Sequence, residues 1–462
     1  MILFDRYLTN KRKTIINQFL LILVMKTPNL LFIFSDQQHW RACGYKNNFF
    51  TTPNQDLIAQ DGFVFNNAFC TTPQCSPSRS SILTGYYPSK TGVWGNIGKA
   101  GGRNLKQATI GKMLQQNGYS TGYVGKWHLG NDGLGTDGWD ESRFLRVDSI
   151  TEFLARGFLR RWKRNKKQPF ALFVSFNNPH HIYQYPGNKL RIKTTKADLP
   201  GTWNRQTFTN RPKCHQEFMK DDQGKIIHGK PVEEWIRYHD WYKKKNKNYD
   251  SKLGRIVRRL KRMGEYDNTL IIITSDHGDM DTNHGLIFKG PFMYEHMVRI
   301  PLIIKPPVGH AKFQQQPGHS DFHTINTDLV PTILDICGIE DPERGKRDGF
   351  SLKPLLSNKK MEDKHEFIIG QYYSKQKWVN PIRMLRTGDY KYNLYIVENS
   401  PQEYFEELYD LNADPDELSN LAYESEYKDI KTDLRQKLDK WIEENDDPFY
   451  SQIKTDRDGR PT

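Results

Sequence analysis

One thiol in the sequence stands in a setting that could make it reactive. Cys75 is followed by Pro77 and Arg79, within a stretch of small hydroxyl residues that spans residues 71–88. Proline is well tolerated in the first turn of a helix, so Pro77 predicts a helix N-terminus at Cys75, where free backbone N–H groups favour anions. Arg79 lies one turn further along the same helical face. This pattern favours chemistry on an anionic group, although it equally fits a small buried thiol near a turn.

Two pairs of polar residues follow apolar runs at distant points of the chain. Asp36 and Gln37 end one run, and Asp276 and His277 end another. Hard divalent cations prefer oxygen ligands, so the two pairs together predict a cation site. The alternative is that the two aspartates only cap strands or helices.

Further polar residues follow two other apolar runs. Lys126 and His128 stand two apart in a strand-like stretch, which predicts that they face the same way. Asn177, Asn178 and His180 follow the next run. A Lys-x-His pair by itself is most simply a surface loop. These residues can form a functional site only if the fold brings them close together.

Four apolar runs must position these side chains, and continuous runs of this kind are typical of parallel strands buried on both faces. They lie at residues 29–35, 120–124, 170–176 and 269–275. Helices are predicted before two of them, at residues 109–114 and 249–264. This alternation predicts an α/β fold with a large, mainly parallel sheet. Because ligands bind beyond the carboxyl ends of such strands, the polar residues are expected at one site.

The pattern changes after about residue 363. Earlier segments predict a strand at 301–305 and a helix at 327–337. Short strand candidates separated by turn residues then predict a small antiparallel sheet, followed by a helix. They lie at 384–386, 390–394 and 407–411, with the helix at 426–444. The expected organisation is a leader (1–25), a catalytic domain (26–363) and a C-terminal subdomain with a tail (364–462).

The motif Cys-x-Pro-x-Arg, followed by Leu-Thr-Gly and Pro88, resembles the signature of the formylglycine-dependent (type I) sulfatases of the alkaline phosphatase superfamily. The matching blocks extend from Pro28 to about Asp447. They include Gly125–Gly130, Pro179-His180, Asp276–Asp279 and Lys289-Gly290. The resemblance implies an alkaline-phosphatase-like fold and hydrolysis of sulfate esters. It also implies that a maturation enzyme oxidises Cys75 to formylglycine, whose hydrated aldehyde attacks sulfur.

The resemblance assigns roles to the basic residues. Arg79 holds the aldehyde hydrate, and Lys126 contacts both the sulfate and the formylglycine. His128 is the base that takes a proton from the hydrate, a task suited to a group whose pKa is near neutrality. His180 and Lys289 grip the sulfate and the bridging oxygen, and one of them protonates the leaving alcohol.

The resemblance also implies one calcium ion. Its ligands are Asp36, Gln37, Asp276 and His277, with the modified Cys75 completing the shell. Gln37 replaces a frequent aspartate and His277 stands where asparagine is common, so the site is less negative than usual. Manganese therefore stays an alternative. A phosphonate monoester or phosphodiester hydrolase of the same superfamily is the alternative function.

The amino-acid composition limits the classes of partner that the protein is expected to bind. A net charge of +14 and a pI near 9.3 favour an anionic partner. The chain has no zinc-finger, helix-turn-helix or RNA-binding motif, which excludes nucleic acid as the leading partner. Basic loops between residues 189 and 230 follow His180, so we expect a sulfated carbohydrate, in particular a polysaccharide fragment, as substrate. The rival explanation is that the charge only keeps the protein soluble.

The N-terminus and the cysteines bear on the compartment. Residues 11–25 are basic and then apolar, as in a secretory signal, although the run is short and contains Asn17 and Gln18. No run approaches the ~20 apolar residues that a membrane span needs. The five cysteines show no disulfide framework or CxxC pair. The expected location is periplasmic or secreted, and the alternative is cytoplasmic if translation starts at Met25.

Overall fold

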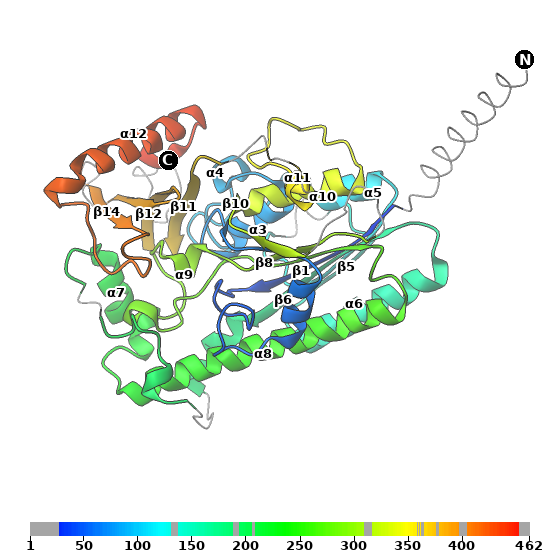
Figure 1. Cartoon of the computed structure of the whole chain (residues 1–462), viewed down its shortest axis with the longest axis horizontal. Coiled ribbons are helices and arrows are strands. Elements are labelled where there is room, and N and C mark those ends of the chain that lie inside the picture. The colour runs from blue at the N-terminus through cyan, green and yellow to red at the C-terminus, as the bar shows by residue number, and fades with distance from the viewer. Residues whose placement is uncertain are drawn as a thin grey trace, which may run out of the picture.

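The computed structural model places most of the chain in one body around a large sheet (Figure 1). It describes residues 27–130, 137–187, 194–205, 208–308, 317–357, 359, 361, 365–375, 378–396 and 404–451. The predicted leader, Met25, the end of the tail and part of the basic segment 189–230 lie outside these residues. Within the described part, no helix has both the length and the hydropathy needed to cross a bilayer.

Eight strands form the sheet in the order β5-β4-β6-β1-β7-β8-β2-β9. Their bounds are β1 Asn29–Asp36, β2 Phe63–Phe65, β4 Ser120–Gly125, β5 Glu141–Phe144, β6 Phe170–Pro179, β7 Thr269–Ser275, β8 Leu302–Lys305 and β9 Gly318–Ser320. The strands β5, β4, β6, β1 and β7 are parallel, and β8 is antiparallel to both of its neighbours, β7 and β2. The predicted α/β fold with a mainly parallel sheet is confirmed.

The central strand β1 is buried along its whole length, as its unbroken apolar sequence predicts. Phe32 pairs with Phe173 on one side and with Ile272 on the other. Leu31 and Ile33 face one layer of helices, while Phe32 packs into the layer on the opposite face. A strand covered on both faces can expose functional groups only at its ends.

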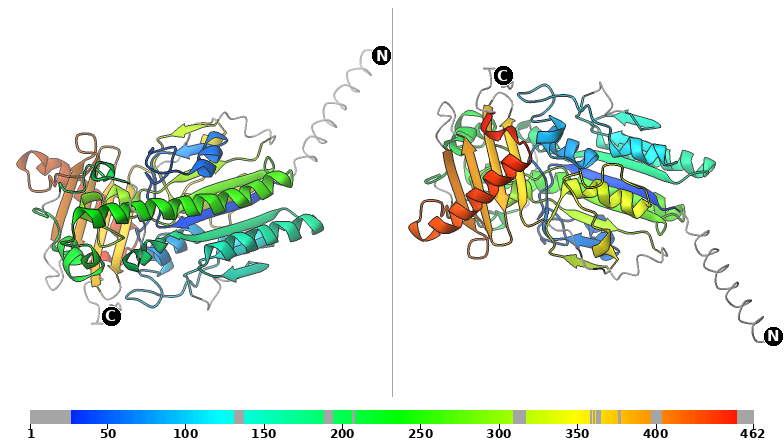
Figure 2. Two further views of the ribbon diagram at one scale, coloured as in Figure 1. Left: turned by 90° about the horizontal axis from the view of Figure 1, so that it is seen from below. Right: turned by 90° about the horizontal axis from the view of Figure 1, so that it is seen from above.

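Helices cover both faces of the sheet (Figure 2). The long helices α6 (Asp148–Asn165) and α8 (Val232–Arg262) run along one face. On the other face lie α3 (Cys75–Thr84), α5 (Ile110–Gln116) and α10 (Leu329–Cys337). The shorter helices are α2 Pro53–Gln60, α4 Pro88–Thr91, α7 Lys213–Asp221, α9 Glu295–Val298 and α11 Lys353–Leu356.

The C-terminal part is a four-stranded antiparallel sheet with a helix across it (Figure 1). Its elements are β11 Ile368–Lys375, β12 Trp378–Arg386, β13 Tyr390–Ile396, β14 Tyr404–Asp410 and α12 Lys428–Glu444. Ile369 and Leu438 belong to the same hydrophobic core as Phe32 of the large sheet. The two sheets therefore share one hydrophobic core, and β11 is a strand that the sequence patterns did not predict.

One sequence-based expectation about a helix was wrong in where the helix begins. The helix expected at 249–264 is α8, which already begins at Val232. Its first half reads as polar, but Trp235, Tyr238 and Tyr242 are buried at helical spacing. Lys245 of this helix is also buried, and its ammonium group donates to Gln184 Oε1 at 3.2 Å.

Candidate active site

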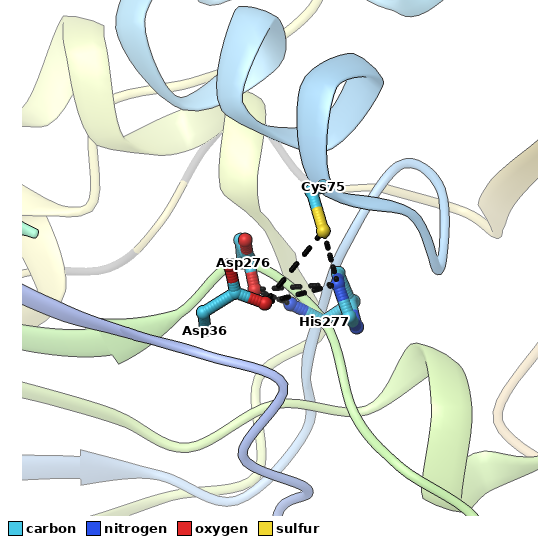
Figure 3. A group of neighbouring side chains, drawn as sticks. All are labelled: Asp36, Cys75, Asp276 and His277. Atoms are coloured by element: carbon cyan, nitrogen blue, oxygen red, sulfur yellow. Dashed lines mark hydrogen bonds and ion pairs between the residues drawn. The ribbon is translucent and has the colours of Figure 1, made fainter. Parts of the chain in front are cut away.

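The polar residues singled out in the sequence meet at the carboxyl ends of the central strands. β1 ends at Asp36, and Asp276 and His277 directly follow β7. α3 begins at Cys75, so the thiol lies at a helix N-terminus as its setting predicts. Pro77 stands in the first turn, where its missing N–H breaks no helical hydrogen bond. Figure 3 shows the four side chains converging from these separate elements.

A compact group of potential ligands forms there. One donor atom from each of Asp36, Cys75, Asp276 and His277 lies within 4.8 Å of the others, and all four residues are buried. Cys75 Sγ is 3.4 Å from His277 Nε2 and 3.6 Å from Asp36 Oδ1. The backbone N–H of Gln37 donates to Asp276 Oδ1 at 3.0 Å, which ties the end of β1 to the end of β7.

Arg79 connects the two carboxylates. Its Nε donates to Asp276 Oδ2 at 2.9 Å, and one terminal nitrogen donates to Asp36 Oδ2 at 3.3 Å. The other terminal nitrogen donates to Ser175 Oγ at 2.7 Å and to the Lys126 carbonyl at 2.8 Å. The guanidinium is completely buried, so these bonds use its fork of donors and fix both carboxylates in place.

Two lysines approach the thiol. Lys289 Nζ lies 2.8 Å from Cys75 Sγ and donates to Gln37 Oε1 at 2.8 Å. Lys126 Nζ lies 3.5 Å from the same sulfur and forms a short ion pair with Asp36. Both ammonium groups are nearly fully buried. Two buried ammonium groups beside one thiol favour the binding of an anion here.

The local charges bias the unmodified thiol toward the thiolate. Burial and Asp36 oppose its ionisation, but Lys126 and Lys289 outweigh them and hold the pKa of Cys75 well below its usual value. Burial also opposes ionisation of Asp36, yet the nearby cations, Lys126 first, lower the pKa of that carboxyl. For Asp276, burial and the neighbouring Asp36 raise the pKa. The site thus gathers several charged side chains in a buried region at the carboxyl ends of the strands.

The loop after β4 brings Lys126 and His128 to the same centre by a route the sequence did not predict. The two residues follow the strand rather than extend it, and His128 has a φ of 63°. Strand alternation therefore does not explain why they face the same way. Burial lowers the pKa of the His128 imidazole, and the neighbouring Cys75 opposes this shift.

The polar residues at the end of β6 and just after it have different partners. Asn177 and Asn178 lie inside β6, and their backbone N–H groups donate to Asp148 at 2.7 and 3.0 Å. These bonds anchor the start of α6 to the end of β6, and the Asn178 side-chain amide also donates to Asp148. His181 turns to Asn178 Oδ1 at 3.2 Å. His180 faces the centre, and burial, followed by Lys126, lowers the pKa of its ring.

Gln37 is held by Asp279, a residue of the block Asp276–Asp279 to which the sequence patterns assigned no role. Gln37 Nε2 donates to Asp279 Oδ2 at 2.5 Å, which leaves Gln37 Oε1 facing Lys289 and the ligand group. Asp279 Oδ1 accepts from the backbone N–H of Asp281 at 2.7 Å and from Tyr238 at 3.2 Å. Burial raises the pKa of Asp279 to about 6. The signal for this residue was its place two positions after His277.

Other neighbours of the site were missed because their sequence context is unremarkable. Ser175 lies within an apolar strand, and Tyr123, in β4, donates to the Lys126 carbonyl at 2.7 Å. Tyr183 lies near His180, with ring centroids 4.9 Å apart. Only the three-dimensional fold reveals these contacts. His284 stacks on Tyr294, with ring centroids 4.1 Å apart.

The donor set fits a hard divalent cation. Asp36 and Asp276 supply carboxylate oxygens, Gln37 an amide oxygen, and His277 an imidazole nitrogen. Conversion of the Cys75 thiol to an aldehyde would replace its sulfur with oxygen. Oxygen-rich sets of this kind suit calcium or manganese rather than soft metals.

Comparison with known families agrees with this geometry. The family model described as sulfatase matches residues 28–339. The chain belongs to the sulfatase family. A second model, described as N-sulphoglucosamine sulphohydrolase, C-terminal, matches residues 282–444. The protein is thus a sulfatase of the alkaline phosphatase superfamily, an enzyme that hydrolyses sulfate esters, and members of its family generally use calcium and formylglycine.

Several relatives match nearly the whole sulfatase. A Δ4,5-hexuronate-2-O-sulfatase from Bacteroides thetaiotaomicron is 28% identical, with 94% of this chain and 92% of the relative covered. An N-acetylglucosamine-6-O-sulfatase from the same organism is 29% identical over 90% of this chain and 86% of the relative. A solved 2-O GAG sulfatase has a TM-score of 0.81 at 26% identity, with 92% and 94% of the two chains covered.

Proposed function

We propose that this sulfatase removes sulfate from carbohydrates through a formylglycine made from Cys75. The observation that carries the proposal is the position of the Cys75 sulfur. It lies at the N-terminus of α3, 2.8 Å from Lys289 Nζ, beside a buried group of carboxylate ligands. A structural thiol has no need of two lysines and an arginine-bound carboxylate pair around it.

The surrounding residues have distinct tasks. The formylglycine supplies the nucleophilic hydroxyl. Arg79 orients it by fixing the adjacent carboxylates, and Lys126 neutralises the sulfate oxygens. His128, which lies beside residue 75, accepts the proton of the nucleophile. His180 and Lys289 bind the bridging oxygen, and one of them protonates the leaving alcohol.

Asp36, Gln37, Asp276 and His277 hold the cation, which we propose to be calcium. The cation supplies charge that offsets the sulfate oxygens. The two carboxylates are fixed by Arg79, so their oxygens are preorganised for it. Metal analysis of active protein is expected to find calcium. Manganese instead, with phosphonate esters turned over faster than sulfate esters, would support the phosphonate or phosphodiester hydrolase alternative.

A carbohydrate is the proposed substrate for two reasons. Two relatives whose names give a carbohydrate substrate, a Δ4,5-hexuronate-2-O-sulfatase and an N-acetylglucosamine-6-O-sulfatase, are 28–29% identical to this chain. The net charge of +14 also suits attraction of a sulfated polymer. A panel of sulfated saccharides and a small aryl sulfate, scored by released sulfate at two salt concentrations, tests this. Faster turnover of the aryl sulfate than of every saccharide, with no effect of salt, would contradict the carbohydrate assignment.

The nucleophile is tested by mass spectrometry of the peptide that contains residue 75. We expect an aldehyde in place of the thiol in active enzyme, introduced by a separate maturation enzyme. A Cys75→Ala variant is the matched control and should retain the fold without turnover. Full activity from protein with an intact thiol would contradict the formylglycine proposal.

We also propose that the enzyme works outside the cytoplasm, in the periplasm or after secretion. The support is the basic and then apolar character of residues 11–25. N-terminal sequencing of the mature protein and cell fractionation test it. A mature protein that begins at Met25 and remains in the cytosol would contradict export while leaving the chemistry unaffected.

A further inference from the structure

A group of exposed apolar side chains lies where β5 leads into α6. Seven large apolar side chains are exposed in the described part of the chain, and four of them fall within residues 144–153. They are Phe144, Val147, Ile150 and Phe153, with exposed fractions of 38, 50, 48 and 60%. The last three stand three residues apart, so they lie next to one another on the first turns of α6. Single apolar side chains are normal on a protein surface, whereas a group of them indicates contact with another surface.

The inner face of α6 already packs against the large sheet. Phe158 and Trp162 are buried there, in the same hydrophobic layer as Ile33 of β1. Turning the helix to bury Ile150 and Phe153 would expose Phe158 and Trp162. The fold therefore keeps the apolar group at the surface.

The same segment is strongly basic. Residues 143–167 contain nine lysines and arginines and two acidic residues, so their net charge of +7 is half of the +14 of the whole chain. Both acidic side chains are buried: Asp148 binds the end of β6, and Glu152 is paired with Arg156 and Arg255. The outward surface of α6 therefore carries cations and no carboxylate.

The neighbouring helix α8 extends this basic surface. Figure 2 shows α6 and α8 side by side along one face of the sheet, and contacts near both ends of α6 join them. Residues 251–262, the last turns of α8, contain six lysines and arginines and no acidic residue. The most exposed of the six are Arg255, Arg258, Lys261 and Arg262. We call the outward faces of α6 and of this part of α8 the α6–α8 surface.

The α6–α8 surface combines the two features that hold a protein on an anionic bilayer. Lysine and arginine side chains are attracted to anionic headgroups, and apolar side chains on the same surface enter the boundary between headgroups and acyl chains. A bilayer also needs no complementary shape, which suits side chains that project from a helix and do not line a groove.

Two other occupants fit this surface less well. In a two-fold dimer the surface would contact itself, which would bring the exposed Arg146, Arg160 and Arg164 close to their own copies. A sulfated polymer would pair with the cations, but its hydrated surface would leave Val147 and Ile150 in contact with water.

We propose that the α6–α8 surface docks this enzyme on the headgroup region of an anionic lipid bilayer, with Ile150 and Phe153 inserted. The enzyme would then lie on the membrane and not cross it, in keeping with the lack of a spanning helix among the described residues. Helix α3, which carries Cys75, covers the opposite face of the sheet, so docking leaves that side of the molecule free. The inference does not depend on which ester the enzyme cleaves.

The test is co-sedimentation of the full-length purified protein with lipid vesicles. One set of vesicles is phosphatidylcholine alone, and the other is an equimolar mixture of phosphatidylcholine and phosphatidylglycerol. Wild type should bind the mixed vesicles and not the neutral ones, and added sodium chloride should weaken the binding because it screens the attraction.

Two double variants separate the contributions of charge and insertion. Arg160→Gln/Arg164→Gln should lower the partition coefficient for mixed vesicles by about ten- to thirtyfold. Ile150→Gln/Phe153→Gln should lower it by about tenfold or more at unchanged net charge, because apolar surface is no longer buried in the bilayer. All four positions are exposed, so the Tm and the turnover of a soluble aryl sulfate should stay at wild-type values.

The matched control is Lys428→Gln/Lys440→Gln, which removes two exposed cations from α12 and gives the same net charge as the arginine variant. It should bind mixed vesicles within about twofold of wild type. The proposal would be overturned if wild type did not bind mixed vesicles, or if the control lost as much binding as the arginine variant. Wild-type binding by Ile150→Gln/Phe153→Gln would also overturn it, since only diffuse attraction would remain.

Two further measurements identify the rival occupants. Light scattering would assign the surface to a second copy of the chain if wild type were a dimer that Ile150→Gln/Phe153→Gln dissociates, with no vesicle binding. Retention on immobilised dextran sulfate without vesicle binding would assign it to a sulfated polymer. Either result would overturn the proposal and leave the proposed sulfatase chemistry unaffected.

Discussion

Replacing Asp279 with asparagine should weaken the cation site although Asp279 is not a ligand. Asp279 Oδ2 accepts from Gln37 Nε2 at 2.5 Å, and this bond sets which end of the Gln37 amide faces the cation. In Asp279→Asn, Oδ1 can still accept from the backbone N–H of Asp281, which leaves the new amide nitrogen facing Gln37. Two N–H donors then oppose each other. We therefore regard Asp279 as a positioning residue.

The size of the effect follows from the two ways in which Gln37 can respond. If Gln37 stays in place, two buried donors lack acceptors, at a cost of about 1–3 kcal/mol. If its amide rotates, an N–H replaces the oxygen that faces the cation and Lys289 Nζ, and one ligand is lost. Changes behind metal ligands typically reduce affinity about 10–100-fold, or about 1.4–2.7 kcal/mol. Both routes predict a loss of this order.

Calcium titration of chelator-treated protein, by calorimetry and by the calcium-dependent shift in Tm, measures the loss without relying on activity. The variant Gln37→Glu/Asp279→Asn exchanges donor and acceptor at unchanged total charge, because the amide introduced at position 279 can then donate to the carboxylate introduced at position 37. It should recover most of the lost affinity, in a double-mutant cycle. Asp281→Asn is the control, since it neutralises a buried aspartate nearby that does not contact Gln37, and it should change the affinity by less than about threefold.

Two results would refute the reasoning. One is calcium binding by Asp279→Asn with the affinity of wild type. The other is a double variant that binds no better than the single variant, because the donor–acceptor exchange would then have no effect.

Three further predictions concern other parts of the molecule. Gly125→Ala should destabilise the protein by about 2–6 kcal/mol, measured by denaturant unfolding, because the φ of Gly125 is 114° and a Cβ would stand 1.9 Å from the Ser175 carbonyl oxygen; a loss below ~1 kcal/mol would contradict this. His365 contacts Asp328 Oδ1 at 2.9 Å, and although burial opposes it, Asp328 raises the pKa of the imidazole. Its stabilisation is therefore complete below the ordinary histidine pKa of about 6.5 and is lost as pH rises through the raised value, so the Tm deficit of His365→Phe should be larger at pH 6 than at pH 9, and an equal deficit at both would argue against it. Removal of the cation by a chelator should lower both Tm and activity, and added calcium should restore them; a Tm that does not respond would speak against a bound cation.

Much of the fold could be predicted because the central strands carry unbroken apolar sequences. Residues 29–35 and 269–275 need no partner information to be recognised as buried strands, and they correspond to β1 and β7. The first half of α8 could not be recognised in this way, because its buried Trp235 and Tyr242 are separated by charged residues. Strand β11 was missed since its pattern is mixed and its burial depends on the neighbouring sheet.

For the site, the positions at strand ends were predictable but the contacts between them were not. Polar residues after apolar runs predicted that Asp36 and Asp276 would meet, and they do through Arg79. The end of the third run was placed too early, because β6 extends to Pro179, so Asn177 lies inside the strand and its backbone N–H donates to Asp148. The role of Asp279 depends on which way an amide points, and no sequence pattern reports that.

The burial of residue 75 sets an order of events in the life of this protein. Cys75 is 1% exposed and is enclosed by Arg79, Lys126 and Lys289. The proposed maturation enzyme must bind the peptide around residue 75, and it cannot reach this side chain once α3 has packed against the sheet. The proposed oxidation therefore competes with folding, and each chain that folds first is trapped without its nucleophile. The specific activity of a preparation then depends on the fraction of chains that were oxidised at residue 75 before they folded.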